Sequence, residues 1–367
     1  MKIRNFTLLF LLFLIFFDST KAISELRYFG RFSEVRENVI TICSQNLERY
    51  GSKRIFLNAN PQKNDYDFER KEEAIVERIK KAQCDVIALQ EILGKNQREA
   101  EDSVNNLAAV ISRAVGQSYE GLVGETNDDF IRVGFIYSRS RLEVEEAASY
   151  KDDELPKLLP IQRPHLFLRL PLELKAKLRL RNGSALPISL VTFHFKSKSG
   201  GTKDPTGYMW ETIRMESAEK LRELVLKRNE KAFKTGGPIL VLLGDRNSDE
   251  TQASSEILEG NLRLSSFQGI NPECQLSKKA KPLCRDAITD HQQVFYSVLT
   301  RDPDTGALPG THTYRKQTSW LDDILMPQAS LPYALEDATK EGDYDSGVVL
   351  DPPEASDHAL VFVRLTI

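Results

Sequence analysis

Short apolar runs recur along this 367-residue chain, and most of them are bounded by polar or turn-forming residues. Runs of this length are typical of strands that are buried within a sheet. Strands are therefore predicted over residues 39–43, 85–89, 133–137, 166–168, 188–195, 239–243, 324–326 and 360–365. The strands at 166–168 and 188–195 are expected to pair around the turn signal Arg181-Asn182-Gly183-Ser184.

Helical spacing of apolar residues separates several of these runs. Helices are predicted at 67–81, around the apolar stripe from Val104 to Val115, and at 211–228. Residues 265–312 are rich in polar and turn-forming residues and are expected to form an extended surface loop.

The composition agrees with a globular protein, since 41% of the residues are apolar and 28% are charged. No internal repeat or linker interrupts the alternation of strands and helices. A single α/β domain is therefore predicted over residues 36–367, preceded by a polar lead-in at residues 23–35.

The N-terminus has the pattern of a secretion signal. Lys2 and Arg4 precede an apolar run over residues 8–17, and small residues follow as far as Ala22. An uncleaved membrane anchor is the alternative, but the run is well short of the ~20 residues that span a bilayer. Residues 1–22 are therefore expected to be removed from a secreted protein, extracellular or periplasmic, with no stable membrane anchor.

Removal of this segment takes away three basic side chains and one acidic one, so the net charge changes from −3 to −5. A net negative charge is not typical of a protein that binds nucleic acid through an extended basic surface. A polyanionic substrate would have to be met by local charge, such as Lys196, Lys198 and Lys203 beside His194.

Four cysteines in an exported chain allow disulfides. Cys274 and Cys284 flank a short polar loop and are predicted to pair, which would contribute on the order of 2–3 kcal/mol. Cys43 and Cys84 lie in or beside predicted strands and are expected to be buried thiols rather than a second bridge. The cysteine and histidine spacings are not those of a structural or catalytic zinc site.

Polar fragments stand where the predicted strands end, and their side chains are suited to binding a hard cation. Asn46 and Glu91 follow two of the strands, and Asp245 and Asn247 follow a third. Oxygen ligands of this kind suit Mg²⁺ or Mn²⁺. Asp245 and Asn247 are two residues apart, so in an extended backbone they point the same way. Each fragment alone can equally be a charged strand end or a plain turn, but three together are hard to explain by packing.

Two histidines complete this chemistry. His358 can act as a general base near neutral pH if Asp322 fixes its tautomer; the alternative is a loop histidine capped by Asp357. Alternation places His194 on the strand face opposite its phenylalanine neighbours, with Lys196 following. His194 could stabilise charge in a transition state, or it could be a core histidine bonded to backbone. Tyr137 and Arg163 are weaker candidates for phosphate contact, with surface packing as the alternative.

The ordered set of fragments resembles a known family. The order Asn46, Glu91, His194, Asp245-x-Asn247, Asp322 and Ser356-Asp357-His358 resembles the endonuclease/exonuclease/phosphatase superfamily of metal-dependent phosphodiesterases, which includes deoxyribonuclease I. The resemblance covers about residues 36–367. The fragment at 193–198, the step Arg163-Pro164 and residues 311–325 look most like secreted bacterial nucleases of this superfamily.

The resemblance implies a four-layer α/β sandwich, in which two mixed β-sheets pack face to face with helices outside. It also implies a Mg²⁺ site, with Mn²⁺ or Ca²⁺ as alternatives, in which Glu91 is the principal ligand and Asn46 lies close by. His358, held by Asp322, would be the general base, and Asp357 would belong to the metal and proton network.

The remaining roles follow from the same resemblance. His194 and Asn247 would stabilise the phosphoryl group, and Asp245 would align the nucleophile or a second cation. One departure is Arg246, because the family usually has an apolar residue between the Asp and Asn of this motif. Alternation is expected to turn Arg246 away from the site, where it pairs with a carboxylate.

These observations favour a secreted, metal-dependent phosphodiesterase, a monomeric nuclease that cleaves DNA, with RNA as an alternative substrate, by attack of water. The enzymatic alternative keeps the chemistry and acts on a phospholipid such as sphingomyelin or on an inositol phosphate. A binding module that has lost catalysis is disfavoured, because Glu91, His194, Asp245 and His358 are all in place. A serine esterase is weaker still, because the chain has no Gly-x-Ser-x-Gly elbow.

Overall fold

The computed structural model describes residues 38–151, 154–158, 165–180, 183–198, 210–267, 293–301, 306–314, 316–335 and 344–367. Two six-stranded sheets and a separate hairpin make up its β-structure. The first sheet has the order β13 (Ser346–Val349), β14 (Leu360–Thr366), β1 (Val39–Tyr50), β2 (Val86–Leu93), β4 (Ile131–Ser138) and β3 (Tyr119–Val123). β1 and β2 are parallel and the other neighbours are antiparallel, so the sheet is mixed.

The second sheet is built in the same way. Its order is β5 (Leu142–Ser149), β6 (Leu172–Arg179), β7 (Ala185–His194), β8 (Ile239–Asp245), β12 (Asp322–Pro327) and β9 (Phe295–Ser297). Here β7 and β8 are the parallel pair. β10 (His312–Tyr314) and β11 (Gln317–Ser319) form the separate hairpin. Each sheet therefore has one central pair of parallel strands whose carboxyl ends lie at the same edge.

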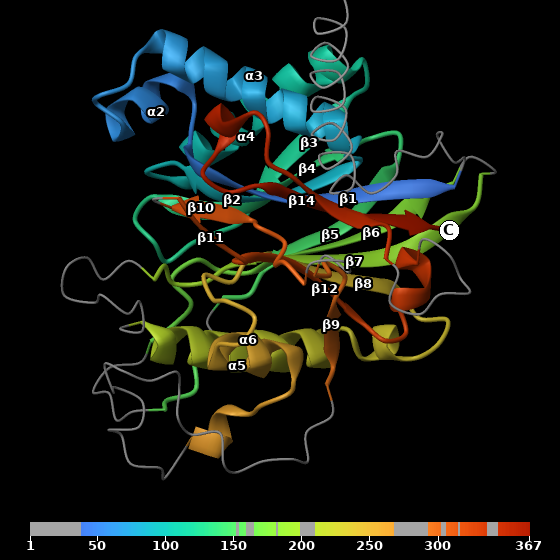
Figure 1. The fold of residues 1–367 in the computed structure, drawn as a ribbon. Coiled ribbons are helices and arrows are strands. Elements are labelled where there is room, and N and C mark those ends of the chain that lie inside the picture. The colour runs from blue at the N-terminus through green and yellow to red at the C-terminus, as the bar shows by residue number, and fades with distance from the viewer. Residues whose placement is uncertain are drawn as a thin grey trace, which may run out of the picture.

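Helices cover the outer face of each sheet, as Figure 1 shows. The first sheet is covered by α2 (Lys53–Ala59), α3 (Asp65–Ala82) and α4 (Gln97–Val115), and the second by α5 (Glu211–Arg228) and α6 (Ala253–Glu259). α3 begins with a capping box in which Asn64 and Asp67 bond each other's backbone N–H groups. The four-layer α/β sandwich expected from the sequence is confirmed.

Three apolar cores separate the four layers, and strand alternation assigns residues to them. Ile40 and Ile42 on β1 face the core between the two sheets, whereas Cys43 faces the helices. On β8, Val241 faces the central core and Leu242 faces α5. A strand buried on both faces needs apolar residues at every position, which explains the continuous apolar runs of the sequence.

Two predictions about these elements were wrong. Residues 166–168 are not a strand; β6 pairs with β7 around the predicted turn instead. The sequence of β6 alternates apolar and charged residues, which suits a strand with one face against the central core. Within the expected loop at 265–312, β9 is an edge strand whose Phe295 is buried and pairs with Pro327.

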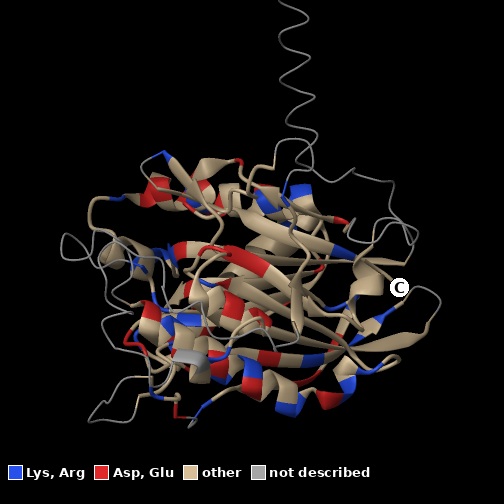
Figure 2. Ribbon diagram, turned by 60° about the horizontal axis from the view of Figure 1, so that its bottom comes forward, with Lys and Arg blue, Asp and Glu red and all other residues tan. Residues whose placement is uncertain are grey.

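The charged side chains are spread over the helices. Figure 2 shows lysines and arginines interspersed with aspartates and glutamates along them. This distribution agrees with the small net charge of −3. Among the helices that the structure describes, none combines the length and the apolar character that crossing a bilayer requires.

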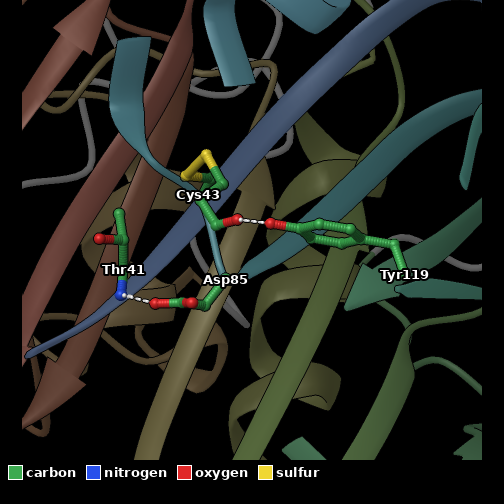
Figure 3. The surroundings of a disulfide bond; sticks show 5 residues. Thr41, Cys43, Asp85 and Tyr119 are labelled. Atoms are coloured by element: carbon green, nitrogen blue, oxygen red, sulfur yellow. Dashed lines mark hydrogen bonds between the residues drawn. A yellow bond between two sulfur atoms is a disulfide. The ribbon is translucent and has the colours of Figure 1, made fainter. Parts of the chain in front are cut away.

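A disulfide joins Cys43 on β1 to Cys84, which lies two residues before the first residue of β2 (Figure 3). The prediction of two free buried thiols was therefore wrong, although both residues are buried. The reason is the parallel pairing of β1 and β2, which places the two Cα atoms 5.9 Å apart, within the range a disulfide spans. Tyr119 donates to the carbonyl of Cys84 beside it. Cys274 and Cys284 lie outside the described residues.

We expect this disulfide to stabilise the fold substantially. The bond closes a loop with a sequence separation of 41, for which chain entropy gives about 4 kcal/mol. Replacement of both Cys43 and Cys84 by alanine should lower the free energy of unfolding by this order, measured with urea under oxidising conditions. A double variant as stable as the native protein would show that the bond does not constrain the unfolded chain.

Candidate active site

The carboxyl ends of the two parallel strand pairs converge on a single point between the sheets. Asn46 near the end of β1 donates from Nδ2 to Glu91 Oε1 on β2 at 3.4 Å and to Asp245 Oδ2 on β8 at 3.0 Å. Glu91 belongs to the first sheet and Asp245 to the second. One amide group therefore links the two sheets, and residues 45 to 199 positions apart in the chain meet there.

Glu91 reaches this point through an irregular backbone. The register of β2 shifts against β4 between Leu89 and Ile92, and Glu91 has a φ of 60°. Asn247, two residues after the end of β8, has a φ of 51°. The left-handed region costs a residue other than glycine on the order of 1–3 kcal/mol, and such strain gathers at functional sites. Burial, and then the nearby Asp245, raise the pKa of Glu91 against the opposing effect of His358.

Asp245 is the most fully bonded carboxylate of the group. Asn247 donates to it twice, from its backbone N to Oδ1 at 2.7 Å and from Nδ2 to Oδ2 at 2.9 Å. Burial raises the pKa of Asp245 even though these donors and His358 oppose the shift. Gly244 lets the strands approach here, because a Cβ at this position would lie 2.1 Å from the carbonyl oxygen of Phe193.

His358 is held by Asp322, as the sequence predicted. The two side chains are joined by a bond of 2.8 Å between Nδ1 and Oδ2, and Nε2 of His358 faces Asp245 at 3.9 Å. Thr311 Oγ1 accepts from the backbone N of Asp322 and so fixes the start of β12. Burial alone would lower the pKa of His358, but Asp322 and Asp245 outweigh it and raise the pKa to about 10. This raised pKa favours the imidazolium form of His358, whose charge offsets that of the carboxylates when no cation is bound.

This protonation state can be tested by nuclear magnetic resonance. In protein freed of divalent ions, the Cε1–H resonance of His358 should titrate near pH 10. Since an unfolded histidine titrates near about 6.5, protonation of His358 stabilises the fold fully below that pH, and this stabilisation is lost as the pH rises through about 10. The difference in unfolding free energy between the native protein and His358→Asn should therefore shrink at high pH. A midpoint at or below about 6.5 would contradict the arrangement.

The pKa of His194 is shifted in the opposite direction from that of His358. His194 is buried at the end of β7, with Nε2 3.4 Å from Asp245 Oδ2 and 3.9 Å from Glu91 Oε1. Burial, and then the positive charge of Arg169, lower its pKa well below the usual value. His194 is therefore neutral and can offer a ring N–H as a hydrogen-bond donor without carrying charge. Nδ1 of His194 has no partner among the described residues.

Comparison with solved structures identifies the fold. The chain matches the human Nocturnin catalytic domain, solved with a bound sulfate anion, at a TM-score of 0.51 and 14% identity, over 92% of this chain and 97% of that one. It matches ANGEL2, described as a 2′,3′-cyclic phosphatase and solved with adenosine-2′,3′-vanadate, at a TM-score of 0.52 and 15% identity, over 90% and 96%. The chain has the endonuclease/exonuclease/phosphatase fold. No family model and no curated protein sequence matches it.

The side chains of this endonuclease/exonuclease/phosphatase fold suit a divalent cation. Glu91, Asp245 and Asp322 bring three carboxylates together, and Oδ1 of Asp322 is buried with no partner among the described residues. Asp245, Asp322 and His358 place ligand atoms within 4.8 Å of one another. A buried excess of negative charge favours a hard cation held by oxygen ligands. Glu91 and Asn46 would hold such an ion, with Asp245 beside them.

One of the predicted phosphate contacts lies away from the site. Tyr137 pairs with Val86 at the beginning of β2, at the end of the sheet away from Glu91, and its hydroxyl donates to Glu120. The predicted phosphate contact of Tyr137 is therefore wrong; the antiparallel direction of β4 places its carboxyl end at the far edge. Arg163 lies outside the described residues.

Lys196 and Arg246 follow His194 and Asp245 closely in the chain. The ammonium group of Lys196 lies 5.0 Å from the centroid of the Trp210 ring. Arg246 points away from the site, as alternation predicted, and pairs with Asp323 at 2.9 Å. It also lies near Glu259, at 3.5 Å.

Asp357 and two residues that the sequence analysis did not single out surround His358. The carboxylate of Asp357 faces His358 at 4.0 Å and His312 at 3.8 Å. The ring of His312, on β10, lies 4.6 Å from that of His358. Burial and His358 lower the pKa of His312. The buried guanidinium of Arg78, on α3, donates to the carbonyls of His358, Leu350 and Ser356 and holds this loop.

Neither missed residue carries a motif that the sequence alone reveals. His312 follows a polar stretch that reads as loop, and Arg78 stands on a helix whose charged residues read as solvent-exposed. The one available signal for Arg78 was its place three residues after Ile75, next to the helix face that the apolar pattern turns inward.

Proposed function

We propose that this protein is a secreted, divalent-metal-dependent phosphodiesterase that hydrolyses nucleic acid. The observation that carries the proposal is the link between the sheets, in which Asn46 bonds both Glu91 and Asp245 beside two histidines whose pKa values are shifted in opposite directions. Neutral donors, carboxylates and a bonded histidine–aspartate pair are the groups that in-line attack of water on phosphorus requires.

Each residue has a distinct task in this proposal. Asp322 fixes the ring of His358 through Nδ1, so that Nε2 is the nitrogen that accepts a proton from the attacking water. Asp245, 3.9 Å from that Nε2, orients the water. His194 and Asn247 donate hydrogen bonds to the phosphoryl oxygens as charge develops on them. A divalent cation, when bound, would withdraw charge from the phosphoryl group and lower the pKa of water.

The raised pKa of His358 is consistent with this role once the negative charge around it is offset. Asp322 and Asp245 are the groups that raise it, against the effect of burial. Positive charge added beside Asp245 would counter that effect and shift the pKa of His358 back toward neutrality. The base is therefore expected to be competent only when the cation is present.

Nucleic acid is the substrate that the surroundings favour. Tyr314, 58% exposed, stands on the same strand as His312 and two residues beyond it, so both point the same way. An exposed ring beside the site can stack on a nucleobase. ANGEL2 is described as a 2′,3′-cyclic phosphatase bound to an adenosine derivative, which supports the same class of substrate.

Secretion is supported by two features of the chain. The segment 1–22 has the pattern of a signal peptide, and a disulfide joins Cys43 to Cys84. Disulfides persist in oxidising compartments and are rare in the cytosol.

A phospholipid is the second candidate substrate, and a patch of apolar side chains favours it. Phe130, Leu166 and Leu168 are each more than a third exposed. The carbonyl of Phe130 accepts from Gly94, three residues after Glu91, which places this loop beside the metal-ligand end of β2. Exposed apolar residues next to an active site can enter a membrane surface.

A substrate panel distinguishes the two. The purified protein should degrade plasmid DNA, single-stranded DNA or RNA in Mg²⁺ or Mn²⁺ and should lose this activity in EDTA. Sphingomyelin vesicles and inositol phosphates belong in the same panel. Release of phosphocholine without cleavage of nucleic acid would show that the substrate is a phospholipid and not a nucleic acid. Cleavage of any substrate in the absence of divalent metal would contradict the mechanism.

A further inference from the structure

The β10–β11 hairpin brings a third described histidine to the site, and the proposed mechanism does not use it. β10 is joined to the loop of His358 by backbone hydrogen bonds, from Thr313 N to the carbonyl of Asp357 at 3.1 Å and from Ala359 N to the carbonyl of Thr311 at 2.6 Å. An isolated bridge pairs His312 with His358 directly. The two imidazoles are therefore fixed relative to each other by main chain and not by flexible side chains alone.

Both rings have Nδ1 occupied and Nε2 turned toward the same carboxylate. Nδ1 of His358 is bonded to Asp322 at 2.8 Å, and Nδ1 of His312 to Ser319 Oγ at 3.2 Å. Nε2 of His312 lies 3.8 Å from Asp357 Oδ2, and Nε2 of His358 lies 4.0 Å from Asp357 Oδ1. Outer hydrogen bonds of this kind are what orient metal-binding histidines.

The separations fit three ligands around one ion. Ligand atoms of His312, Asp357 and His358 all lie within 4.8 Å of one another. Zinc binds nitrogen and oxygen at about 2.0–2.2 Å, so two ligands on one ion lie about 3.3 Å apart in tetrahedral geometry. The side chains of His312 and Asp357 are 16% and 40% exposed, so small rotations can close the remaining gap.

We propose that His312, Asp357 and His358 form a second cation site that selects an imidazole-binding transition-metal ion such as Zn²⁺, and that its occupation inhibits the enzyme. Two imidazoles and one carboxylate suit Zn²⁺ better than Mg²⁺, which prefers oxygen ligands. This site differs in donor type from the oxygen-rich group around Glu91 and Asn46. The inhibitory consequence rests on the proposed function, because it requires His358 as the base; the metal site itself does not.

The inhibition has a simple physical cause. When zinc binds, Nε2 of His358 releases its proton to solvent, and the ion occupies the lone pair that would accept a proton from water. Asp322 would remain on Nδ1 and strengthen the metal bond, as an outer carboxylate does for a ligating histidine. The hairpin would then act as a clamp that holds the base in an inactive state.

Direct binding tests the site without reference to activity. The purified protein is titrated with Zn²⁺ by calorimetry in excess Mg²⁺, and with Co²⁺ by visible absorption. We expect Ser319→Ala to weaken zinc binding by about 10–100-fold and His312→Asn to weaken it at least as much. His165→Asn is the matched control, because His165 bonds Glu216 elsewhere in the fold and should leave binding unchanged. Zinc affinity that is the same in His312→Asn and the native protein would overturn the site.

The second measurement separates this inference from the proposed function. For each variant that keeps the native thermal unfolding, the rate in Mg²⁺ is compared with and without Zn²⁺, so that each protein is its own reference. Native protein and His165→Asn should be inhibited, whereas His312→Asn and Ser319→Ala should resist. If zinc binding depends on His312 but the protein cleaves no phosphodiester, the zinc site is supported and the proposed function fails. If the protein cleaves phosphodiesters and zinc inhibits all variants equally, the proposed function stands and the zinc site is wrong.

Discussion

Replacement of His358 by alanine is expected to lower kcat for phosphodiester cleavage by about 10²–10⁴-fold, the usual contribution of a positioned general base. Nε2 of this ring is the nitrogen left for proton transfer once Asp322 holds Nδ1. Asp322→Asn should also reduce kcat, because an amide can no longer accept the Nδ1 proton with full charge. Its effect should be smaller than that of removing the ring.

The loss must be separated from a loss of folding. His358 is buried, so the variant is examined by circular dichroism and thermal unfolding before its kinetics are compared. His165→Ala provides the control, since it removes an imidazole that bonds Glu216 away from the site. If His358→Ala cleaves substrate as fast as the control, the base lies elsewhere in the molecule.

The pH profile should support the same assignment. The base acts in its neutral form, so cleavage should rise with pH through the pKa of His358 in the metal-bound protein. That midpoint should lie below the value of about 10 that the carboxylates impose on the metal-free site.

Most of the fold could be predicted because its strands are buried on both faces. The continuous apolar runs at β1, β2, β8 and β14 are strands in the structure, and the polar residues that end them meet at one edge. Strands with mixed sequence were harder to recognise. β5 and β9 are edge strands of the second sheet, and little in their composition separates them from loops.

What the sequence could not supply was the distance between segments. The parallel pairing of β1 and β2 decides that Cys43 and Cys84 are bonded, and no local pattern contains that pairing. The direction of β4 decides that Tyr137 lies far from Glu91. His312 lies beside His358 because β10 forms an isolated antiparallel bridge with the loop of His358. Residue type predicted the chemistry, and topology selected which residues take part.

Replacement of Glu91 by glutamine is expected to have two effects of opposite sign. Burial raises the pKa of Glu91, so its ionised form destabilises the metal-free fold. The stability that a raised carboxyl pKa contributes is present below the unfolded value and is lost as the pH rises through the folded one. Near neutral pH, a neutral amide of the same shape should therefore make the metal-free protein at least as stable as the native one, measured by thermal unfolding in EDTA.

In the presence of Mg²⁺ the native protein should be more stable than Glu91→Gln. An ion that binds only the folded state stabilises it by about 2.7 kcal/mol at a hundredfold excess over Kd, and Glu91→Gln removes the ligand on which this gain depends. Activity in the variant should fall and should recover only at higher Mg²⁺ concentration. Glu120→Gln, at the other end of the first sheet, should show neither effect. The backbone of Glu91 fits this pattern, since an anionic residue held at a φ of 60° and only partly exposed is costly to the fold unless a cation is bound. Equal Mg²⁺ stabilisation of Glu91→Gln and Glu120→Gln would place the cation elsewhere.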